Sequence, residues 1–317
     1  MEIRRLFLGG ALAAAACLVT VQAQQPAPPG GAPATPPVPP MIKGELIRQI
    51  SEHVWVIPDQ NVPLVPNVGI VVGSKATLVI DTGLGAKNAE IVLREVAKIQ
   101  RAADLYLVTT HVHPEHDLGA GAFPPATRMI RSQDQVAEIA SSGLDMAKRF
   151  ATFSPLHAEL LKDAKFRKAD IVFEVEHRMD LGGVRVRMTA MGFNHTKGDT
   201  ATWVEPDRVL FTGDVSMKAL PNVGGGSTIA QWIGSQEIFE TLHPTTVVPS
   251  HGPTGDATMI STNAKFLQTV QQRVAELKKA GRTVDETVAA LQQELQPAYG
   301  ASPRMATTIR SAYAQAQ

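Results

Sequence analysis

Cysteine is almost missing from this sequence of 317 residues, in which Cys17 is the single example. One thiol cannot form a disulfide within the chain. A mature form without the N-terminal segment would also lack any thiolate nucleophile or thiolate metal ligand. A metal site in the rest of the chain must therefore use histidine and carboxylate side chains.

The sequence also has no excess of charge of either sign and few aromatic residues. Thirty Lys and Arg balance thirty Asp and Glu, so the formal net charge is zero, and aromatic residues make up 5%. Nucleic-acid binding needs a basic surface, and stacking of bases needs aromatic platforms. We therefore expect a small-molecule partner and no nucleic acid. No feature of the sequence indicates an oligomeric state.

Residues 1–23 are predicted to be an export signal peptide. Arg4 and Arg5 precede an apolar run from Leu6 to Val21, and Ala23 ends a small-residue cleavage site. The run is too short and too rich in alanine for a permanent span, so no stable membrane span is expected after signal removal. The paired arginines resemble part of a twin-arginine signal, and the sequence leaves open both that route and general secretion. Both routes predict a periplasmic or secreted protein.

Residues 24–41 are rich in Pro, Ala and Gly and are predicted to form a disordered linker. Residues 42–317 are predicted to form the folded domain, which ends in helices. Apolar patterns predict strands at 53–57, 68–72, 77–81, 105–109, 171–175, 184–190, 201–205, 209–212 and 246–249. Helical spacing covers 86–100, 133–150, 155–163 and 263–280, a Thr283/Glu286 capping box starts the next helix, and Ser302-Pro303 starts the last. Two β-then-α halves favour an α+β sandwich with helices outside.

Three histidines and a carboxylate lie within six residues, in the sequence His111-Val112-His113-Pro114-Glu115-His116. Side chains alternate along an extended strand end, so His111 and His113 should point the same way. Pro114 then breaks the strand, so Glu115 and His116 can turn to a second position. Imidazole with carboxylate suits zinc and also iron or manganese. A polar loop of solvated histidines is the alternative, but three of the nine histidines in the chain gather here.

Three further candidate ligands follow predicted strands: His195 in a turn, Asp214 in Thr-Gly-Asp, and His251 in Pro-Ser-His-Gly. An Asp in such a place is usually a turn former. Together, however, the three residues supply ligands at strand-to-loop junctions, where sites are commonly built on rigid scaffolds. Asp81 also follows a buried strand and precedes Thr-Gly.

These residues, in this order, resemble the metallo-β-lactamase superfamily over residues 47–266. The resemblance implies a four-layered αβ/βα sandwich and two metal ions, with zinc favoured and iron or manganese as alternatives. It implies that His111, His113 and His195 hold one ion, that Glu115, His116 and His251 hold the second, and that Asp214 bridges them. Asp81 would support the site loop from behind the ligands; a plain turn role is the alternative.

The sequence departs from the family pattern at Glu115, where the family usually has Asp. One added bond moves the carboxylate by ~1.5 Å, whereas ligand distances tolerate only about ±0.2 Å. The backbone must therefore shift, Glu115 must bind differently, or the second metal site is weakened. The expectation from sequence is that Glu115→Asp raises second-metal affinity or activity.

The resemblance implies a metal-dependent hydrolase in which Glu115 and Asp214 are the candidate catalytic residues. Two adjacent cations lower the pKa of a shared water, and the hydroxide attacks an acyl carbonyl at a C–N or C–O bond. A β-lactam-type cyclic amide or ester is the favoured substrate. A lactonase or a glyoxalase II-like thioesterase is the alternative. Outside hydrolases, the alternatives are a di-iron oxidoreductase and a non-catalytic metal-binding protein.

Lys218 and Asn222 are the candidate substrate-binding residues. Exported β-lactamases of this superfamily carry a Lys and an Asn in this region, which bind a carboxylate and a carbonyl. Lys218 lies four residues after Asp214, where a spacing of three is expected, so a solvated surface lysine is the alternative.

Overall fold

The computed structural model describes residues 38–317, which form one unit. The predicted export signal and most of the predicted linker lie outside these residues. The side-chain amide of Asn88 donates to the Pro40 carbonyl at 3.0 Å and accepts from the Ile42 amide at 2.7 Å. Ordered contacts therefore begin before the expected linker end at residue 41.

Two β-sheets form the centre of the described part of the chain. The first sheet has the order β1-β2-β3-β4-β5-β6-β7, and its strands are β1 (Arg48–Gln49), β2 (Val54–Ile57), β3 (Val68–Val72), β4 (Ala76–Ile80), β5 (Asp104–Val108), β6 (Arg128–Ser132) and β7 (Ile171–Phe173). The second has the order β12-β11-β10-β9-β8, and its strands are β8 (Glu176–Asp180), β9 (Arg185–Gly192), β10 (Asp199–Val204), β11 (Val209–Gly213) and β12 (Thr246–Pro249). Strands β4 to β7 pair in parallel, as do β11 and β12, and the other pairs are antiparallel.

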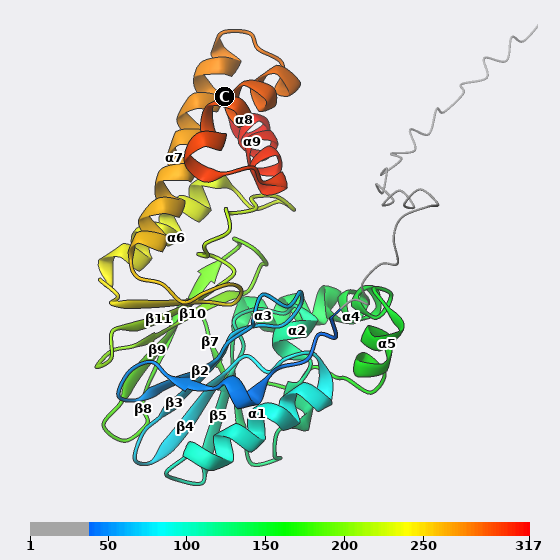
Figure 1. The fold of residues 1–317 in the computed structure, drawn as a ribbon, viewed down its shortest axis with the longest axis vertical. Coiled ribbons are helices and arrows are strands. Elements are labelled where there is room, and N and C mark those ends of the chain that lie inside the picture. Colours follow the sequence, from blue (N-terminus) through cyan, green and yellow to red (C-terminus); the bar gives the residue numbers. More distant parts are fainter. Residues whose placement is uncertain (1–37) are drawn as a thin grey trace, which may run out of the picture. The chain divides into compact units, whose positions relative to one another are not determined.

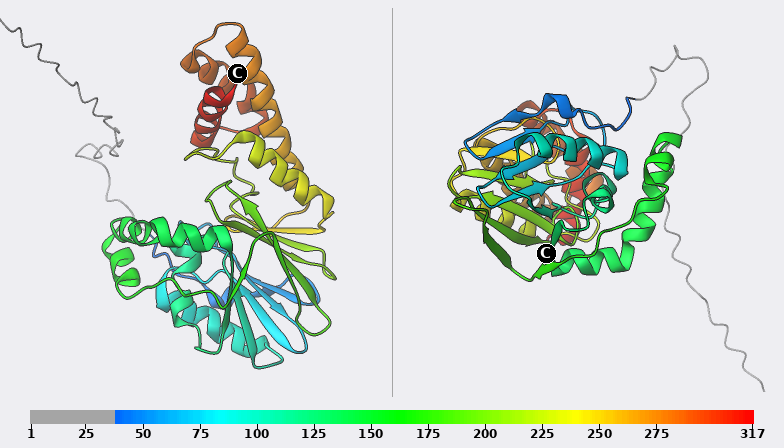
Figure 2. Two further views of the ribbon diagram at one scale, coloured as in Figure 1. Left: turned by 180° about the vertical axis from the view of Figure 1, so that it is seen from behind. Right: turned by 90° about the horizontal axis from the view of Figure 1, so that it is seen from below.

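Helices cover both outer faces of this pair of sheets (Figures 1 and 2). The helices are α1 (Gly85–Ile99), α2 (Pro114–Asp117), α3 (Gln133–Glu138), α4 (Leu144–Ala151), α5 (Pro155–Leu161), α6 (Ile229–Thr241), α7 (Thr258–Lys279), α8 (Val284–Tyr299) and α9 (Pro303–Gln315). Helix α1 packs on the first sheet, and Phe239 of α6 and Ile260 of α7 pack on the second. The predicted four-layered αβ/βα sandwich of the α+β class is thereby confirmed.

Because side chains alternate between the two faces of a strand, each strand of the first sheet can contribute to two apolar cores, one on each face of the sheet. In β4, Leu78 and Ile80 face the second sheet and pack with Met188 and Phe211. Val79 points the opposite way and packs in the cluster that contains the inner face of α1. Both faces of the sheet are therefore buried, which explains why this strand is an uninterrupted apolar run.

The segment predicted as one helix over 133–150 has an interruption. Helix α3 passes into a π-helical turn, η3 (Ile139–Gly143), before α4 begins. Single π turns inside α-helices frequently occur at functional sites. Helix α4 brings Arg149 and Phe150 to the cavity described below.

The C-terminal helices form their own apolar cluster with α6, in which Trp232, Phe266, Leu291 and Ile309 are buried. The predicted capping box is confirmed, because Thr283 and Glu286 each accept a hydrogen bond from the other's backbone amide. Within residues 38–317, no helix combines the length and apolarity that a membrane span would require.

Candidate metal centre

The local sequence explains how one short loop presents four candidate ligands. Strand β5 delivers the chain to His111 and His113, and the backbone at His113 is extended. Pro114 occupies the first position of α2, where its fixed φ starts a helix and its missing amide hydrogen is not needed. The backbone therefore turns after His113, and α2 carries Glu115 and His116 to a second position.

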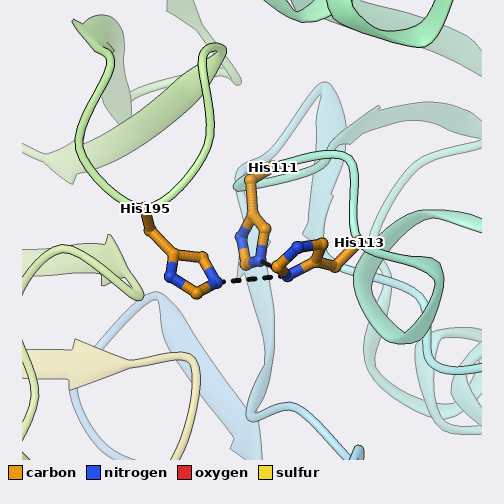
Figure 3. A group of neighbouring side chains, drawn as sticks. All are labelled: His111, His113 and His195. Atoms are coloured by element: carbon orange, nitrogen blue, oxygen red, sulfur yellow. Dashed lines mark hydrogen bonds between the residues drawn. The ribbon is translucent and has the colours of Figure 1, made fainter. Parts of the chain in front are cut away.

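His111, His113 and His195 form the first group, with His195 reaching it from the loop between β9 and β10 (Figure 3). The Nδ1 atom of His113 lies 3.1 Å from Nε2 of His111 and 3.1 Å from Nε2 of His195. Burial lowers the pKa of His113 to about 3, and it lowers the pKa of His111 and His195 as well. The imidazoles are therefore neutral near pH 7, which is the state that binds metal.

Glu115, His116 and His251 form the second group, and their ligand atoms lie within 4.8 Å of one another. In the described part of the chain, the buried atoms Glu115 Oε2 and His116 Nε2 have no hydrogen-bond partner. An unpartnered buried polar atom is costly, so both atoms are suited to an ion between them. His251 is oriented from behind, because its Nδ1 lies 3.0 Å from the Val65 carbonyl.

Asp214 lies between the two groups. One carboxylate oxygen is 3.3 Å from His195 Nε2, and the other is 3.9 Å from His251 Nε2. Burial alone would raise the Asp214 pKa, but electrostatic interaction with the neighbouring His251 and His195 side chains lowers it below its usual range. The preceding Gly213 has φ of +60°, and a Cβ there would lie 3.1 Å from the Thr110 side chain. A tight turn thus directs an ionised carboxylate to the place where the predicted bridging role would operate.

Asp81 lies behind His116, where the predicted supporting role would operate. Its carboxylate accepts hydrogen bonds from the Thr110 amide at 2.7 Å and hydroxyl at 3.0 Å, and lies 2.9 Å from His116 Nδ1. Burial alone would lower the pKa of His116, but the Asp81 carboxylate raises it to about 9. Asp81 has φ of +66°, a strained conformation of the kind found at functional sites. The contact aims His116 Nε2 at the second group.

Sequence reasoning missed two buried contacts that hold the ligand loops. Asp199 accepts hydrogen bonds from the His195 amide at 2.6 Å and from the Thr196 amide and hydroxyl at 3.0 and 2.7 Å. Asp117 forms a bidentate ion pair with Arg131, so its carboxylate is not free to bind a metal. A carboxylate four residues after His195 is a weak signal for the first contact. No local sequence pattern predicts the pairing of Asp117 with Arg131.

A cavity of about 810 Å³ opens over both groups. Lys218 lines it, as the predicted substrate contact requires, whereas Asn222 is exposed and is not among the lining residues. The structure therefore does not bring Asn222 to the site. It adds side chains that sequence reasoning missed, namely Arg149, Phe150, Phe153 and Arg304.

The position of Glu115 in the structure reverses the effect on second-metal affinity that the sequence predicts for Glu115→Asp. The loop already brings its carboxylate to His116 and His251, and Oε1 lies 3.7 Å from His116 Nε2. The Asp side chain is shorter by ~1.5 Å, so we expect Glu115→Asp to lower second-metal affinity by about tenfold or more. Zinc titration of both proteins, followed by calorimetry, measures this change. Tighter second-site binding in Glu115→Asp would restore the expectation from sequence, and unchanged binding would contradict both expectations.

Similarity to solved structures extends over most of the chain. The inverting sec-alkylsulfatase Pisa1 from a Pseudomonas species matches with a TM-score of 0.68 and 16% identity, covering 85% of this chain and 50% of that one. The chain thus spans about half the length of that sulfatase. A metallo-β-lactamase from Pontibacter korlensis has a TM-score of 0.55 and 19% identity, covering 70% of this chain and 98% of that one. An archaeal superfamily protein from Sulfolobus tokodaii has a TM-score of 0.51 and 21% identity, covering 67% of this chain and 85% of that one.

The family model described as the metallo-beta-lactamase superfamily matches residues 61–251, more than half of the chain. No curated protein matches the chain by sequence. The matched residues include both ligand groups and end at His251. By fold, by sequence pattern and by the geometry of the clustered histidines, this chain belongs to the metallo-β-lactamase superfamily.

Proposed function

We propose that the protein is a zinc-dependent hydrolase that cleaves an acyl C–N or C–O bond of a small molecule. One observation carries the proposal: seven candidate ligands converge at the floor of a cavity, and three of their buried atoms have no hydrogen-bond partner within residues 38–317. These atoms are Glu115 Oε2, His116 Nε2 and Asp214 Oδ1. Members of this superfamily are metal-dependent hydrolases, which supports the same conclusion.

The donor set fits two ions. His111, His113 and His195 would hold the first, and the second would be held by Glu115, His116 and His251, with Asp214 between them. Bound ions would acidify a water molecule and polarise the substrate carbonyl. Burial raises the pKa of Glu115, which suits a carboxyl group that exchanges a proton during hydrolysis.

The surrounding residues position this machinery. Asp81 fixes the ring of His116, and Asp199 fixes the backbone of His195. Phe150 packs beside His113, with ring centroids 5.7 Å apart, and shields that edge of the site from water. Fewer waters strengthen the electrostatic interactions inside the cavity.

A β-lactam-type cyclic amide or ester is the first candidate substrate. The cavity is lined by Lys218, which can pair with a substrate carboxylate, and the fold is shared with metallo-β-lactamases. A lactone or thioester is the alternative within acyl transfer. Hydrolysis of an alkyl sulfate ester is a second candidate function, because the similarity to the alkylsulfatase covers 85% of this chain and that to the Pontibacter korlensis metallo-β-lactamase covers 70%.

A hydrolysis screen on zinc-loaded protein tests the proposal. The panel contains a cephalosporin, a penicillin, a lactone, a thioester and a secondary alkyl sulfate, each assayed with and without a chelator. We expect one of the four acyl compounds to be hydrolysed, with the activity lost on chelation and regained on adding zinc. Turnover of the alkyl sulfate alone would instead support the second candidate function. No turnover across the panel, or turnover that survives complete metal removal, would contradict the proposal.

A further inference from the structure

Three cationic side chains from separate segments line the cavity. Arg149 comes from α4, Lys218 from the loop after β11, and Arg304 from the first turn of α9. Within residues 38–317, none of them forms a salt bridge. Three carboxylates line the cavity. Glu115 and Asp214 face the histidine groups, and Asp59 accepts a hydrogen bond from the Gly252 amide at 2.7 Å. The cations are therefore available to an anionic ligand.

Helix stability does not explain Arg304. Ser302 caps α9, Pro303 is the first helical residue, and Arg304 follows directly. A cation in the first turn opposes the helix dipole, which favours negative charge at that end. Arg304 is half-buried and lines the same cavity as His195 and Asp214 of the metal centre.

Hydrogen bonds link the start of α9 to the segment that follows Lys218. The Arg304 Nη1 donates to the Leu220 carbonyl at 3.3 Å, two residues beyond Lys218. The Thr308 hydroxyl, one turn further along α9, donates to the Pro221 carbonyl at 2.8 Å and accepts from the Val223 amide at 3.1 Å. The start of α9 is therefore fastened to the loop that carries Lys218.

Two phenylalanines give part of the cavity lining an apolar surface. Phe150 and Phe153 lie with ring centroids 4.8 Å apart, and Phe153 is 47% exposed. An exposed phenylalanine beside a buried one, both lining the same cavity, is suited to an apolar group of a bound molecule.

We propose that Arg304, supplied by the C-terminal helix α9, is a specificity-determining residue that binds an oxyanion of the substrate together with Lys218. Arg presents paired N–H donors that match a carboxylate or sulfate group. The Phe150–Phe153 pair takes an apolar group of the same molecule. The substrate class is therefore an organic anion with an apolar portion, and its identity as substrate rests on the proposed function.

Calorimetric binding of three matched probes tests this. The probes are 4-phenylbutyrate, 3-phenylpropane-1-sulfonate and the neutral 4-phenylbutanol, each titrated into zinc-loaded and metal-free protein. We expect wild type to bind at least one anion at least tenfold more tightly than the alcohol in both forms. The anion that binds more tightly shows whether the site prefers a carboxylate or a sulfate-like group. Arg304→Gln should weaken that anion by about ten- to hundredfold and leave the alcohol within about threefold.

Arg310→Gln is the matched control, because Arg310 lies on the same helix, is exposed and pairs with Asp285. It should leave all three affinities unchanged. Should Arg304→Gln fold poorly, Arg304→Lys and Lys218→Gln replace it, with weaker anion binding expected in each. An anion preference that Arg304 and Lys218 variants leave unchanged, or one that disappears on metal removal, overturns the proposal. Intact anion binding without hydrolysis of any panel member contradicts the proposed function alone.

Discussion

Replacing His195 with alanine is expected to abolish tight binding of one metal ion and to reduce hydrolysis by at least about a hundredfold. Loss of a contact behind a metal ligand already costs about 10- to 100-fold, and His195 is itself one of only three imidazoles in its group. Two remaining imidazoles cannot complete a four-coordinate zinc site. Elemental analysis of the purified variant measures the stoichiometry, and steady-state kinetics on the best substrate of the panel measures the activity.

His177→Ala is the control for this variant. His177 lies on β8, stacks on Phe173 and belongs to neither ligand group, so its replacement should leave metal content and activity unchanged. Thermal unfolding of both variants shows whether each is folded. A folded His195→Ala protein that keeps wild-type metal stoichiometry would show that His195 is not a ligand.

Replacing Arg131 with methionine should cause the largest loss of stability, about 3–5 kcal/mol, because it leaves a buried charge without its partner. Arg131 is 1% exposed and Asp117 is fully buried, and the two form a bidentate ion pair. Asp117 closes helix α2, which carries Glu115 and His116, so we expect second-metal affinity to fall as well. Urea unfolding of the metal-free protein measures the change in the free energy of unfolding.

The double variant Arg131→Met/Asp117→Leu separates the charge effect from lost packing. Replacing a whole buried ion pair with apolar side chains is often neutral or stabilising, so the double variant should be more stable than Arg131→Met alone. The Thr109 hydroxyl would lose its bond to Asp117, so recovery should be partial. A single variant destabilised by less than about 1 kcal/mol would show that the pair contributes little.

Local sequence determined the elements whose burial shows directly in the pattern of apolar residues. Strands β3 and β12 have the predicted bounds, 68–72 and 246–249, because each is a short apolar run in a layer buried on both sides. Strands β6 and β8 escaped prediction. The first hides a buried arginine and the second is polar along its length, so neither shows an apolar pattern. The π turn within 133–150 likewise leaves no mark on helical spacing.

The sequence by itself determined the chemistry of the site, because His111, His113, Glu115 and His116 are neighbours along the chain and one strand end presents them. Only the tertiary structure decided which distant side chains lie beside these four residues. His195 contacts His113 although 82 residues separate them in the sequence, and Arg304 of the last helix lines the same cavity. Asn222 stays outside a cavity that Lys218 lines. Periodicity reports which face of an element is buried, whereas these encounters depend on how distant elements pack, which no local pattern encodes.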